Sequence, residues 1–543
     1  MNKILPIGMD SFRKIRENNR YYIDKTLMIR DFLQYQDEVA LITRPRRFGK
    51  TLNMTMMCEF FDITKDSRAI FDGLAIMDTE YAGQINTRPV IYFSFKDCKG
   101  DTVETLLYKI SFIVFVEYQK YYAVIKEKTD ITKACYHRYL LIYEQLINNT
   151  IKKYVLEESI FILEWALSEL YQIKPILLID EYDQPIVSSF QHGYHNQVKE
   201  FFSGFYGAAL KGSDYLHQAL LTGIQRIVKE SIFSQLNHVT VYTVVSDYYA
   251  PYFGLNTGET EKLLSDYGLS LDDAVKQQYD GYRFGSSEVY NPWSILNYAK
   301  TGILDNYWIN TSTNFLIRDS IKTADELFHA DFNTLINVGT ATVSVNLECS
   351  FIELKHRHTL WGLLINSGYA TIISRINRLQ MAIRIPNGEV MSEFMKIIAD
   401  SAHVDDGDLQ EMFQHLSNKK MDDFIKIYHK IVINCTSYFD ATENAYHMLF
   451  LGMCISLNSL YKIKSNIESG YGRSDIIMES LSDDRPHIVI EFKQGEAVDE
   501  LKEEALTQII ENKYYAGLMG EVVCLGIAHD KKRCEMAHKT IFI

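Results

Sequence analysis

The chain has 543 residues, of which 47% are hydrophobic, 23% charged and 13% aromatic. This balance excludes an intrinsically disordered, collagen-like or disulfide-stapled protein, and the length allows about three to four domains. With 56 Lys and Arg against 70 Asp and Glu, the formal charge is −14, so any contact with nucleic acid must use local basic surface.

The cysteines and the apolar segments indicate the compartment. The eight cysteines show neither a CxxC pair nor the spacing of a metal site, which favours free thiols in a reducing compartment. The N-terminal apolar patch is broken by Pro6 and Gly8 and is too short for the core of a signal peptide. The uncharged run 444–461 contains His447 and Asn458, so we expect a buried core helix there and not a membrane span. We therefore expect a cytoplasmic protein.

Short β-branched runs alternate with long helical stretches over residues 1–250. This alternation predicts an α/β domain built on a mainly parallel sheet. We expect its strands at residues 39–43, 89–95, 176–179, 218–221 and 239–245.

The pattern changes after this first domain. Residues 251–345 lose most strand candidates and gain Gly, Asn, Tyr and Trp, which predicts a mostly helical lid. We expect residues 346–400 to form a helical connector. Residues 401–543 begin with helices and continue with two β runs, a helix over 499–515 and a last strand near 521–527, which predicts a second α/β unit.

Residues 39–51 follow the order of strand, tight loop and helix, and they end in Gly-Lys-Thr. This ending fits the P-loop pattern GxxxxGK[ST], although Arg44 replaces the first glycine. Gly49 lets backbone N–H groups turn toward an anion, and the following helix adds the positive end of its dipole. Lys50 would reach the β- and γ-phosphates, and the Thr51 hydroxyl would complete the shell of a Mg²⁺ ion. We expect nucleotide contacts from Arg47, Phe48, Gly49, Lys50 and Thr51.

A matching acidic motif lies at residues 176–181, a continuous apolar run that ends in Asp180 and Glu181. Such a run is typical of a buried parallel strand with carboxylates at its C-terminal end. Asp180 would hold Mg²⁺ and Glu181 would polarise the attacking water; the alternative is a core strand followed by an acidic turn. Thr222, at the end of the next strand candidate, is either a γ-phosphate sensor or a helix cap, and Arg226 lies just beyond it.

Four motifs make this pattern more specific. They are Leu5-Pro-Ile-Gly8, Tyr22-Ile-Asp24-Lys25-Thr26, Arg44-Pro-Arg-Arg-Phe-Gly-Lys-Thr51 and Leu178-Ile-Asp-Glu-Tyr-Asp183. Together they resemble the AAA-ATPase-like family of uncharacterised bacterial proteins, whose members similarly lack the first P-loop glycine. The resemblance extends over nearly the whole chain. It implies an ATP-binding domain, usually followed by a nuclease-like domain, with ATP and Mg²⁺ as cofactors.

The expected lid contains a group of aromatic residues that also matches this family. A packing cluster is a simpler interpretation of these side chains than a platform for stacked bases. The residues are Tyr279, Tyr282, Phe284, Tyr290 and Trp293.

A second chemical signal lies near the C-terminal end, where Gly-Arg-Ser-Asp475 is followed, after a turn, by His-Ile-Val-Ile-Glu491-Phe-Lys493. Because side chains alternate along a strand, Glu491 and Lys493 share one face and apolar residues fill the other. Asp475 could supply a second carboxylate if the two runs pair as a hairpin. Two carboxylates and a lysine suit a divalent ion that polarises a phosphodiester; a structural ion pair is the alternative.

This combination resembles the PD-(D/E)xK nuclease superfamily, particularly the version that follows AAA-ATPase-like domains. That version has a helical glutamate, a nearby Tyr-His pair and an acid before the Gly-Arg-x-Asp turn, which correspond here to Glu443, Tyr446-His447 and Glu468. Gln508 and Tyr514 match the superfamily's Gln…Tyr element, although helix packing is the simpler expectation for them. The resemblance implies that the metal ligands are Glu443, Asp475 and Glu491 and that Lys493 is catalytic.

These expectations combine into a P-loop ATPase joined to a Mg²⁺-dependent nuclease of the restriction-endonuclease type, in which the nucleotide state gates cleavage. The expected partner is nucleic acid, with DNA as the favoured substrate, and a homo-oligomer is compatible with the sequence. One alternative is a nucleotide-switched interaction protein whose nuclease-fold domain does not cut. Another is an ATPase that remodels protein partners.

Overall fold

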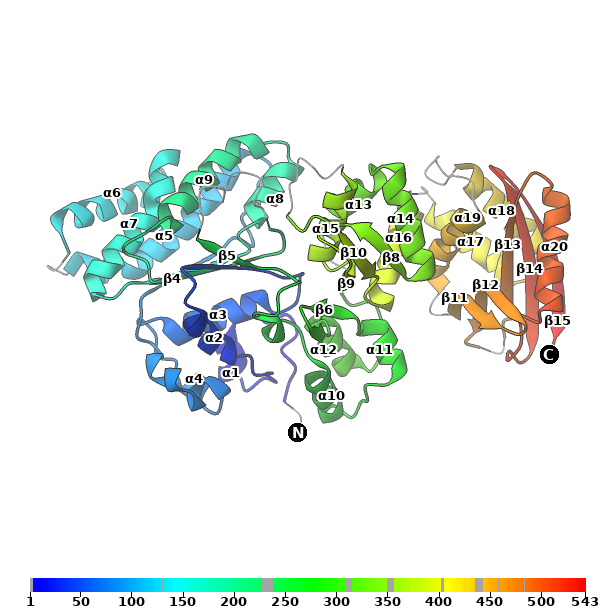
Figure 1. Cartoon of the computed structure of the whole chain (residues 1–543), viewed down its shortest axis with the longest axis horizontal. Helices are drawn as coiled ribbons and strands as arrows, with labels where there is room; N and C mark the ends of the chain where they lie inside the picture. The colour runs from blue at the N-terminus through cyan, green and yellow to red at the C-terminus, as the bar shows by residue number, and fades with distance from the viewer. Residues whose placement is uncertain are drawn as a thin grey trace. The chain divides into compact units, whose positions relative to one another are not determined.

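The computed structural model describes residues 3–127, 131–226, 238–308, 315–348, 356–401, 405–434, 443–457, 460–482 and 484–543. The chain divides into two compact units, one formed by residues 1–335 and 339–388 and the other by residues 336–338 and 389–543 (Figure 1). We call them the N-terminal unit and the C-terminal unit.

A five-stranded parallel sheet forms the centre of the N-terminal unit, with strand order β2-β3-β4-β1-β5. Its strands are β1 (Val39–Thr43), β2 (Val90–Ser94), β3 (Ile176–Asp180), β4 (Gln218–Gly223) and β5 (Val239–Tyr242). Every residue of β1, β3 and β4 is buried, which explains their continuous apolar sequences. The prediction of an α/β domain on a parallel sheet is confirmed.

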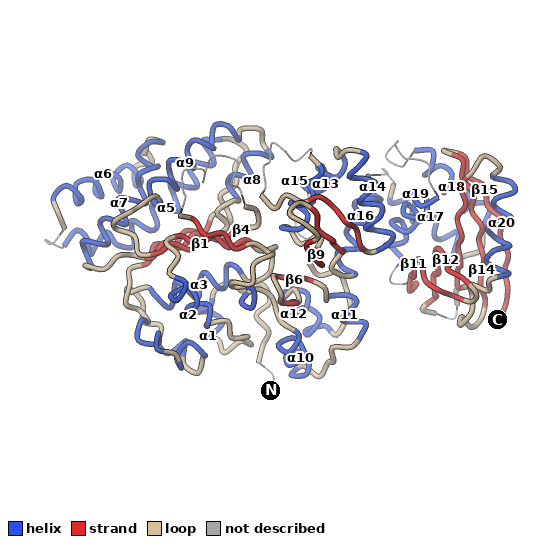
Figure 2. The backbone as a smooth tube through the Cα atoms, viewed as in Figure 1, coloured by secondary structure: helices blue, strands red, loops and turns tan. Residues whose placement is uncertain are grey.

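Helices cover both faces of this sheet (Figures 1 and 2). On one side lie α1 (Phe12–Glu17), α2 (Leu27–Tyr35), α3 (Lys50–Phe61) and α4 (Arg68–Phe71). On the other side lie α5 (Val103–Glu127), α6 (Lys133–Ile147), α7 (Lys153–Tyr171), α8 (Gln184–Gln191) and α9 (His195–Leu210). This arrangement buries both faces and leaves the carboxyl ends of the strands as the place for a ligand.

The segment expected to be a helical lid is mainly helical, with a short hairpin inside it. Its elements are α10 (Thr257–Asp266), α11 (Asp273–Tyr279), β6 (Tyr282–Phe284), β7 (Ser287–Val289), α12 (Pro292–Thr301), α13 (Phe315–Lys322), α14 (Glu326–Val338) and β8 (Thr340–Ser344). Tyr279 and Tyr290 belong to a buried core between these helices, as the packing interpretation of the aromatic residues predicts.

The segment 346–400 is not purely helical, which corrects the expectation of a helical connector. It contains α15 (Arg357–Asn366), β9 (Thr371–Arg375), β10 (Gln380–Arg384) and the start of α16 (Gly388–Ser401). The two strands join β8 in an antiparallel sheet of order β8-β10-β9. Most of β9 is exposed, so its sequence lacks the apolar alternation that marks a half-buried strand.

The C-terminal unit is built on a five-stranded mixed sheet of order β11-β12-β13-β14-β15. The strands are β11 (Tyr461–Ser469), β12 (Gly472–Ser480), β13 (His487–Gln494), β14 (Glu521–Asp530) and β15 (Arg533–Phe542). The parallel pair β13–β14 is connected by α20 (Val498–Glu511). A further strand, β15, therefore follows the one that we expected to be the last.

Helices also cover both faces of the C-terminal sheet. α17 (Asp406–Ser417), α18 (Met421–Asn434) and α19 (Glu443–Met453) contribute to a core with Ile488, Ile490 and Phe492 of β13. On the other face, Val489 packs with Ile509 of α20. β13 thus has the alternation that the sequence predicted, with its apolar face toward α17–α19.

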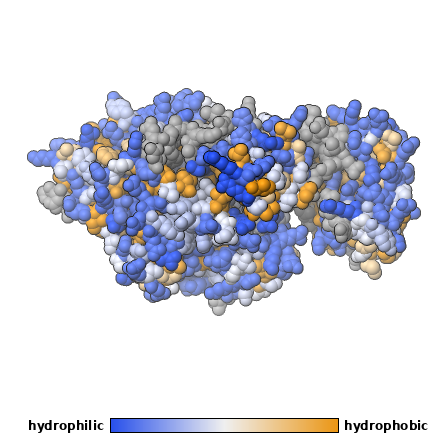
Figure 3. Space-filling view, in the orientation of Figure 1, coloured by the Kyte–Doolittle hydropathy of each residue, from blue (hydrophilic) through white to orange (hydrophobic). Residues whose placement is uncertain are grey.

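The uncharged run near residue 450 behaves as a core segment. α19 covers most of it, and Leu449, Phe450 and Met453 lie in the core of the C-terminal unit. Among the described residues, no helix is long and apolar enough to cross a lipid bilayer. On the face shown in Figure 3, hydrophilic residues predominate and hydrophobic ones are scattered between them, as is normal for a folded surface.

Candidate functional site

The loop between β1 and α3 has two residues with left-handed backbone conformations. Gly49 has a φ of 88° and Arg47 a φ of 65°, both in the left-handed region, and Lys50 begins α3. The Lys50 ammonium donates to the backbone carbonyls of Arg44 at 3.0 Å and Pro45 at 2.8 Å. Burial lowers the pKa of Lys50, whereas the nearby Glu181 carboxylate acts in the opposite direction. The loop therefore wraps around the lysine that the sequence assigned to the phosphates.

Arg44, which replaces the first glycine of the general P-loop pattern, is completely buried. Its guanidinium donates to the carbonyls of Thr43 at 2.8 Å and Tyr242 at 3.1 Å. It also lies 5.0 Å from the ring centroid of Phe284 and 5.3 Å from that of Phe253. Burial lowers its pKa to about 9. Arg44 is thus a packing residue that anchors the loop to β5 and to the hairpin strand β6.

Asp180, at the end of β3, connects two hydroxyls. Its Oδ2 accepts a hydrogen bond from Thr51 at 2.7 Å, and its Oδ1 accepts one from Thr222 at 2.6 Å. Thr222 lies inside β4, so the helix-cap interpretation of this residue is wrong. The carboxylate and the Thr51 hydroxyl provide the hard oxygen ligands that Mg²⁺ prefers in nucleotide sites.

A cavity of about 480 Å³ lies beside this hydrogen-bonded group, and Lys50, Thr51 and Glu181 line it. Glu181 has a φ of 52°, which places its side chain just past the end of β3 in a strained turn. Burial raises its pKa, and the charge of Lys50 opposes this effect. Lys96 and Lys99 add further positive charge to the wall. The cavity therefore combines the positive charge and the carboxylate that a nucleotide phosphate site requires.

One wall of the cavity was not predicted. Trp293 of α12 lines it, and the Arg47 guanidinium stacks 3.7 Å from the Trp293 ring centroid. We expected Trp293 only as part of the packing cluster, together with Phe284, which does pack against Phe48. The two residues of the Arg–Trp pair are far apart in sequence, so only the folded chain reveals the contact.

The C-terminal site depends on the pairing of β12 and β13. The strands are antiparallel, with Ile476 opposite Ile490, so the expected hairpin is confirmed. Asp475 and Glu491 each lie one residue beyond this pair, on the same face of the sheet. Asp475 Oδ2 accepts from the backbone N–H of Phe492 at 2.8 Å, and Glu491 Oε2 accepts from the backbone N–H of Asp475 at 3.4 Å. The two carboxylates therefore meet across neighbouring strands.

Lys493 and a glutamine complete this group. The Lys493 ammonium lies 3.8 Å from Glu491 Oε1. Gln508 of α20 donates to the same oxygen and to the Tyr514 hydroxyl, the latter at 3.0 Å. The expectation that Gln508 serves only in helix packing is therefore wrong, because its amide holds the Glu491 carboxylate. The matching sequence signal was the Gln…Tyr element.

The two carboxylates of the C-terminal site lie in a largely buried environment. Burial raises the pKa of Asp475, while the Phe492 N–H and the charge of Lys493 act in the opposite direction. Glu491 is only 4% exposed, so its charge needs compensation. Two converging carboxylates with hard oxygens fit Mg²⁺. Within the described part of the chain, no group of three or more His, Cys, Asp and Glu residues could hold a metal.

The structure does not describe the side chains of two acids that the resemblance implied. Glu443 is the first residue of α19 and Glu468 lies in β11, but their side chains are outside the described residues. His447, from the Tyr-His pair, is buried and stacks on Phe492 with a centroid distance of 5.8 Å. Burial lowers its pKa to about 4, so this histidine is neutral at neutral pH.

Comparison with known proteins finds two family matches along this chain. Residues 6–233 match the family described as "Predicted AAA-ATPase", and residues 441–539 match the family described as "PD-(D/E)XK nuclease superfamily". A protein of Azotobacter chroococcum mcd 1, described as "Uncharacterized protein in vnfD 5'region", is 25% identical over 395 residues, which cover 72% of this chain and 68% of that protein. Residues 6–233 are therefore similar to the predicted AAA-ATPase family, and residues 441–539 are similar to the PD-(D/E)XK nuclease superfamily.

Proposed function

We propose that this protein binds and hydrolyses ATP in its N-terminal unit and cleaves nucleic acid in its C-terminal unit, with the nucleotide state gating cleavage. DNA is the proposed substrate. The observation that supports the proposal most directly is the meeting of the Asp475 and Glu491 carboxylates across β12 and β13, with Lys493 beside them. A structural ion pair would need only one acid and one base, whereas a second carboxylate suits a cation.

The proposed roles in the nucleotide site follow from the contacts around the loop. The backbone of Arg47, Phe48 and Gly49 faces the phosphates, and Lys50 leaves its carbonyl partners to bind them. Thr51 and Asp180 hold the Mg²⁺ that accompanies ATP, and Thr222 senses the γ-phosphate through Asp180. Glu181, in the same cavity, orients the attacking water.

The proposed roles in the nuclease site divide between binding and positioning. Asp475 and Glu491 would hold Mg²⁺, which would stabilise charge on the scissile phosphate. Lys493 orients or activates the attacking water and offsets the developing negative charge. Gln508 keeps the Glu491 carboxylate in place through its hydrogen bond. Glu443 is proposed as a further metal ligand on the resemblance alone.

Nucleotide gating is supported by the charge of the chain. A formal charge of −14 opposes tight constitutive binding of a polyanion. Binding of nucleic acid in a form that can be cleaved therefore requires a second event that can be regulated. The ATPase site provides such an input because ATP binding changes the contacts of Lys50, Thr51 and Asp180 together.

Cleavage of labelled DNA and RNA by the full chain, with and without ATP and Mg²⁺, tests the proposal. Lys493→Ala should abolish metal-dependent cleavage, whereas Lys502→Ala should not, because Lys502 lies on α20 and pairs with Asp499 at 3.3 Å and Glu535 at 3.6 Å. Equal cleavage by the Lys493→Ala and wild-type proteins would refute the nuclease assignment. Absence of a metal site dependent on Asp475 in calorimetry would favour the nucleotide-switched interaction protein.

A further inference from the structure

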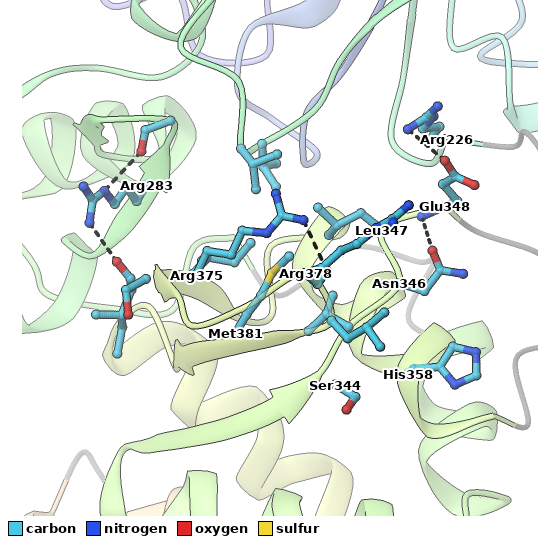
Figure 4. Close-up of a pocket in the computed structure, with 18 of the residues that line it drawn as sticks. Arg226, Arg283, Ser344, Asn346, Leu347, Glu348, His358, Arg375, Arg378 and Met381 are labelled. Carbon is cyan, nitrogen blue, oxygen red and sulfur yellow. Dashed lines mark hydrogen bonds and ion pairs between the residues drawn. The ribbon is translucent and has the colours of Figure 1, made fainter.

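A second cavity of the N-terminal unit is larger than the one beside Lys50. It is a groove of about 1130 Å³ between the β9–β10 hairpin, the segment after β5, the β6–β7 turn and the segment after β8 (Figure 4). Four arginines from different parts of the sequence reach it, as Figure 4 shows. They are Arg226, Arg283, Arg375 and Arg378.

Two of these arginines are fixed by backbone carbonyls and not by acids. Arg283 donates to the carbonyls of Gly285 at 3.1 Å and Ile373 at 3.0 Å. Arg375 donates to the carbonyls of Asn377 and Arg378, both at 3.2 Å. A carbonyl orients a guanidinium without neutralising it, so both groups keep their charge and lose little freedom when they bind an anion.

The acidic residues that line the groove do not cancel the positive charge of its arginines. Arg226 pairs with Glu348 at 3.1 Å, and Asp247 accepts from the backbone N–H of Ser286 at 2.6 Å. The side chain of Arg378 makes no hydrogen bond or ion pair with any residue that the structure describes, and Arg378 is exposed. Four arginines against two acids leave a formal excess of two positive charges in a chain whose total is −14.

We propose that this groove binds the phosphodiester backbone of a nucleic-acid strand. Arginine forks match phosphate oxygens, and a local positive groove is what an acidic protein needs to attract a polyanion. Apolar side chains such as Val245, Leu347 and Leu379 lie between the arginines and suit sugars and bases. The inference deepens the proposed function, on which it rests: it names a site on the ATPase unit that holds the substrate of the nuclease.

Binding of labelled single- and double-stranded oligonucleotides by the full chain tests the groove. Fluorescence anisotropy in buffer with EDTA separates binding from cleavage. The double variant Arg375→Glu/Arg378→Glu should bind about tenfold or more weakly, and the slope of log affinity against log salt should fall by about two, one unit per lost phosphate contact. The single variant Arg378→Glu removes no contact within the chain and should lower the slope by about one.

The matched control makes the same change in net charge at two arginines outside the groove. Arg68 is exposed and Arg138 is 61% exposed, with Glu158 at 3.7 Å, so Arg68→Glu/Arg138→Glu changes the net charge equally without touching the groove. This control should bind as the wild type does. Equal weakening in both double variants, or unchanged binding in the groove variant, would overturn the proposal.

Two further measurements separate this inference from its alternatives. Asp475→Ala should bind oligonucleotide normally and fail to cut it, so loss of cleavage in that variant leaves the groove proposal standing. If a phosphorylated peptide displaces the oligonucleotide at equal concentration, the groove is a site for a protein partner and the proposal is wrong. Absence of oligonucleotide binding by the wild-type chain, with and without ATP, would also overturn it.

Discussion

At the residue scale, Glu181 combines a side chain with a proposed catalytic role and a strained backbone. Its φ of 52° is rare for a residue other than glycine, and such strain is concentrated at functional sites. We predict that Glu181→Gln lowers ATP turnover by about 100-fold or more, because the amide cannot accept a proton from water. Nucleotide affinity should change little, since the side chain keeps its shape. Phosphate release at saturating ATP and calorimetric binding measure the two effects separately.

Glu80→Gln provides the control for this variant, because Glu80 is exposed on a short 3₁₀ helix far along the chain from the loop. Its turnover should equal that of the wild type. Retained turnover in Glu181→Gln would mean that another group orients the water.

Glu164 of α7 gives the molecule a predictable pH dependence. The side chain is fully buried, and Ser213 donates to its Oε2 at 2.9 Å. Burial raises its pKa well above the ordinary value, so the folded state binds a proton more tightly than the unfolded state. This contribution to stability is fully present below the unfolded pKa and is lost as the pH rises through the folded pKa.

We therefore predict that Glu164→Gln raises the urea midpoint of unfolding at pH 8 and that the gain disappears near pH 4. Glu158→Gln is the control, since Glu158 is 58% exposed and pairs with Arg138 at 3.7 Å. A gain of equal size at both pH values would show that the carboxyl does not titrate between them.

At the element scale, β4 connects the nucleotide site with its surroundings. Thr222 donates to Asp180, and the two backbone N–H groups that follow β4, of Ile224 and Gln225, donate to the Asp183 carboxylate at 2.9 and 2.8 Å. The Gln225 amide in turn donates to the Ser367 hydroxyl at 2.9 Å. The carboxyl end of β4 is thus held on one side by the acids after β3 and on the other by α15.

We predict that Asp183→Ala lowers the free energy of unfolding by about 3 kcal/mol, because it leaves one buried and one partly buried backbone N–H group without an acceptor. Asp97→Ala, at an exposed position, should change it by less than about 0.5 kcal/mol. Urea denaturation followed by the fluorescence of the tryptophans measures both. A small effect of Asp183→Ala would mean that water replaces the carboxylate.

All five strands expected in the first domain are present, and three of them are the most deeply buried. β1, β3 and β4 are buried along their whole length, so their apolar runs are unbroken. β9 could not be predicted in this way, because it is mostly exposed and its sequence has no unbroken apolar run. The pairing of Asp475 with Glu491 was predictable because an antiparallel hairpin joins neighbouring segments, but the expected Gly-Arg-Ser-Asp475 turn is the start of β12.

At the scale of the whole molecule, the proposal requires two activities that can be lost separately. We predict that Lys50→Ala weakens ATP binding about tenfold or more and removes the effect of ATP on cleavage. Lys493→Ala should lower cleavage by about 10²- to 10³-fold and leave ATP turnover unchanged, because the two lysines lie in different compact units. Parallel assays of phosphate release and DNA cleavage on the same preparations check both statements.

Loss of both activities in either single variant would point to a folding defect, which circular dichroism of the variants would reveal. Normal ATP control of cleavage in the Lys50→Ala protein would contradict nucleotide gating.

The contacts that sequence reasoning missed are those between distant parts of the chain. The P-loop residues were found because they are consecutive, but the stacking of Arg47 on Trp293 joins residues about 250 positions apart. Gln508 had a matching motif, yet its bond to Glu491 depends on the packing of α20 against β13. The local pattern determines each element, whereas these contacts depend on tertiary packing.

The buried guanidinium of Arg44 has a consequence for protein engineering. Since its partners are carbonyls of β1 and β5 and the rings of Phe253 and Phe284, this phosphate loop cannot be transplanted as an autonomous cassette. A graft of residues 39–51 alone would bury the Arg44 guanidinium in another protein without the carbonyls and aromatic rings that surround it here. A chimera would therefore have to include the β6–β7 hairpin and β5 as well. In practice the whole unit would have to be transferred.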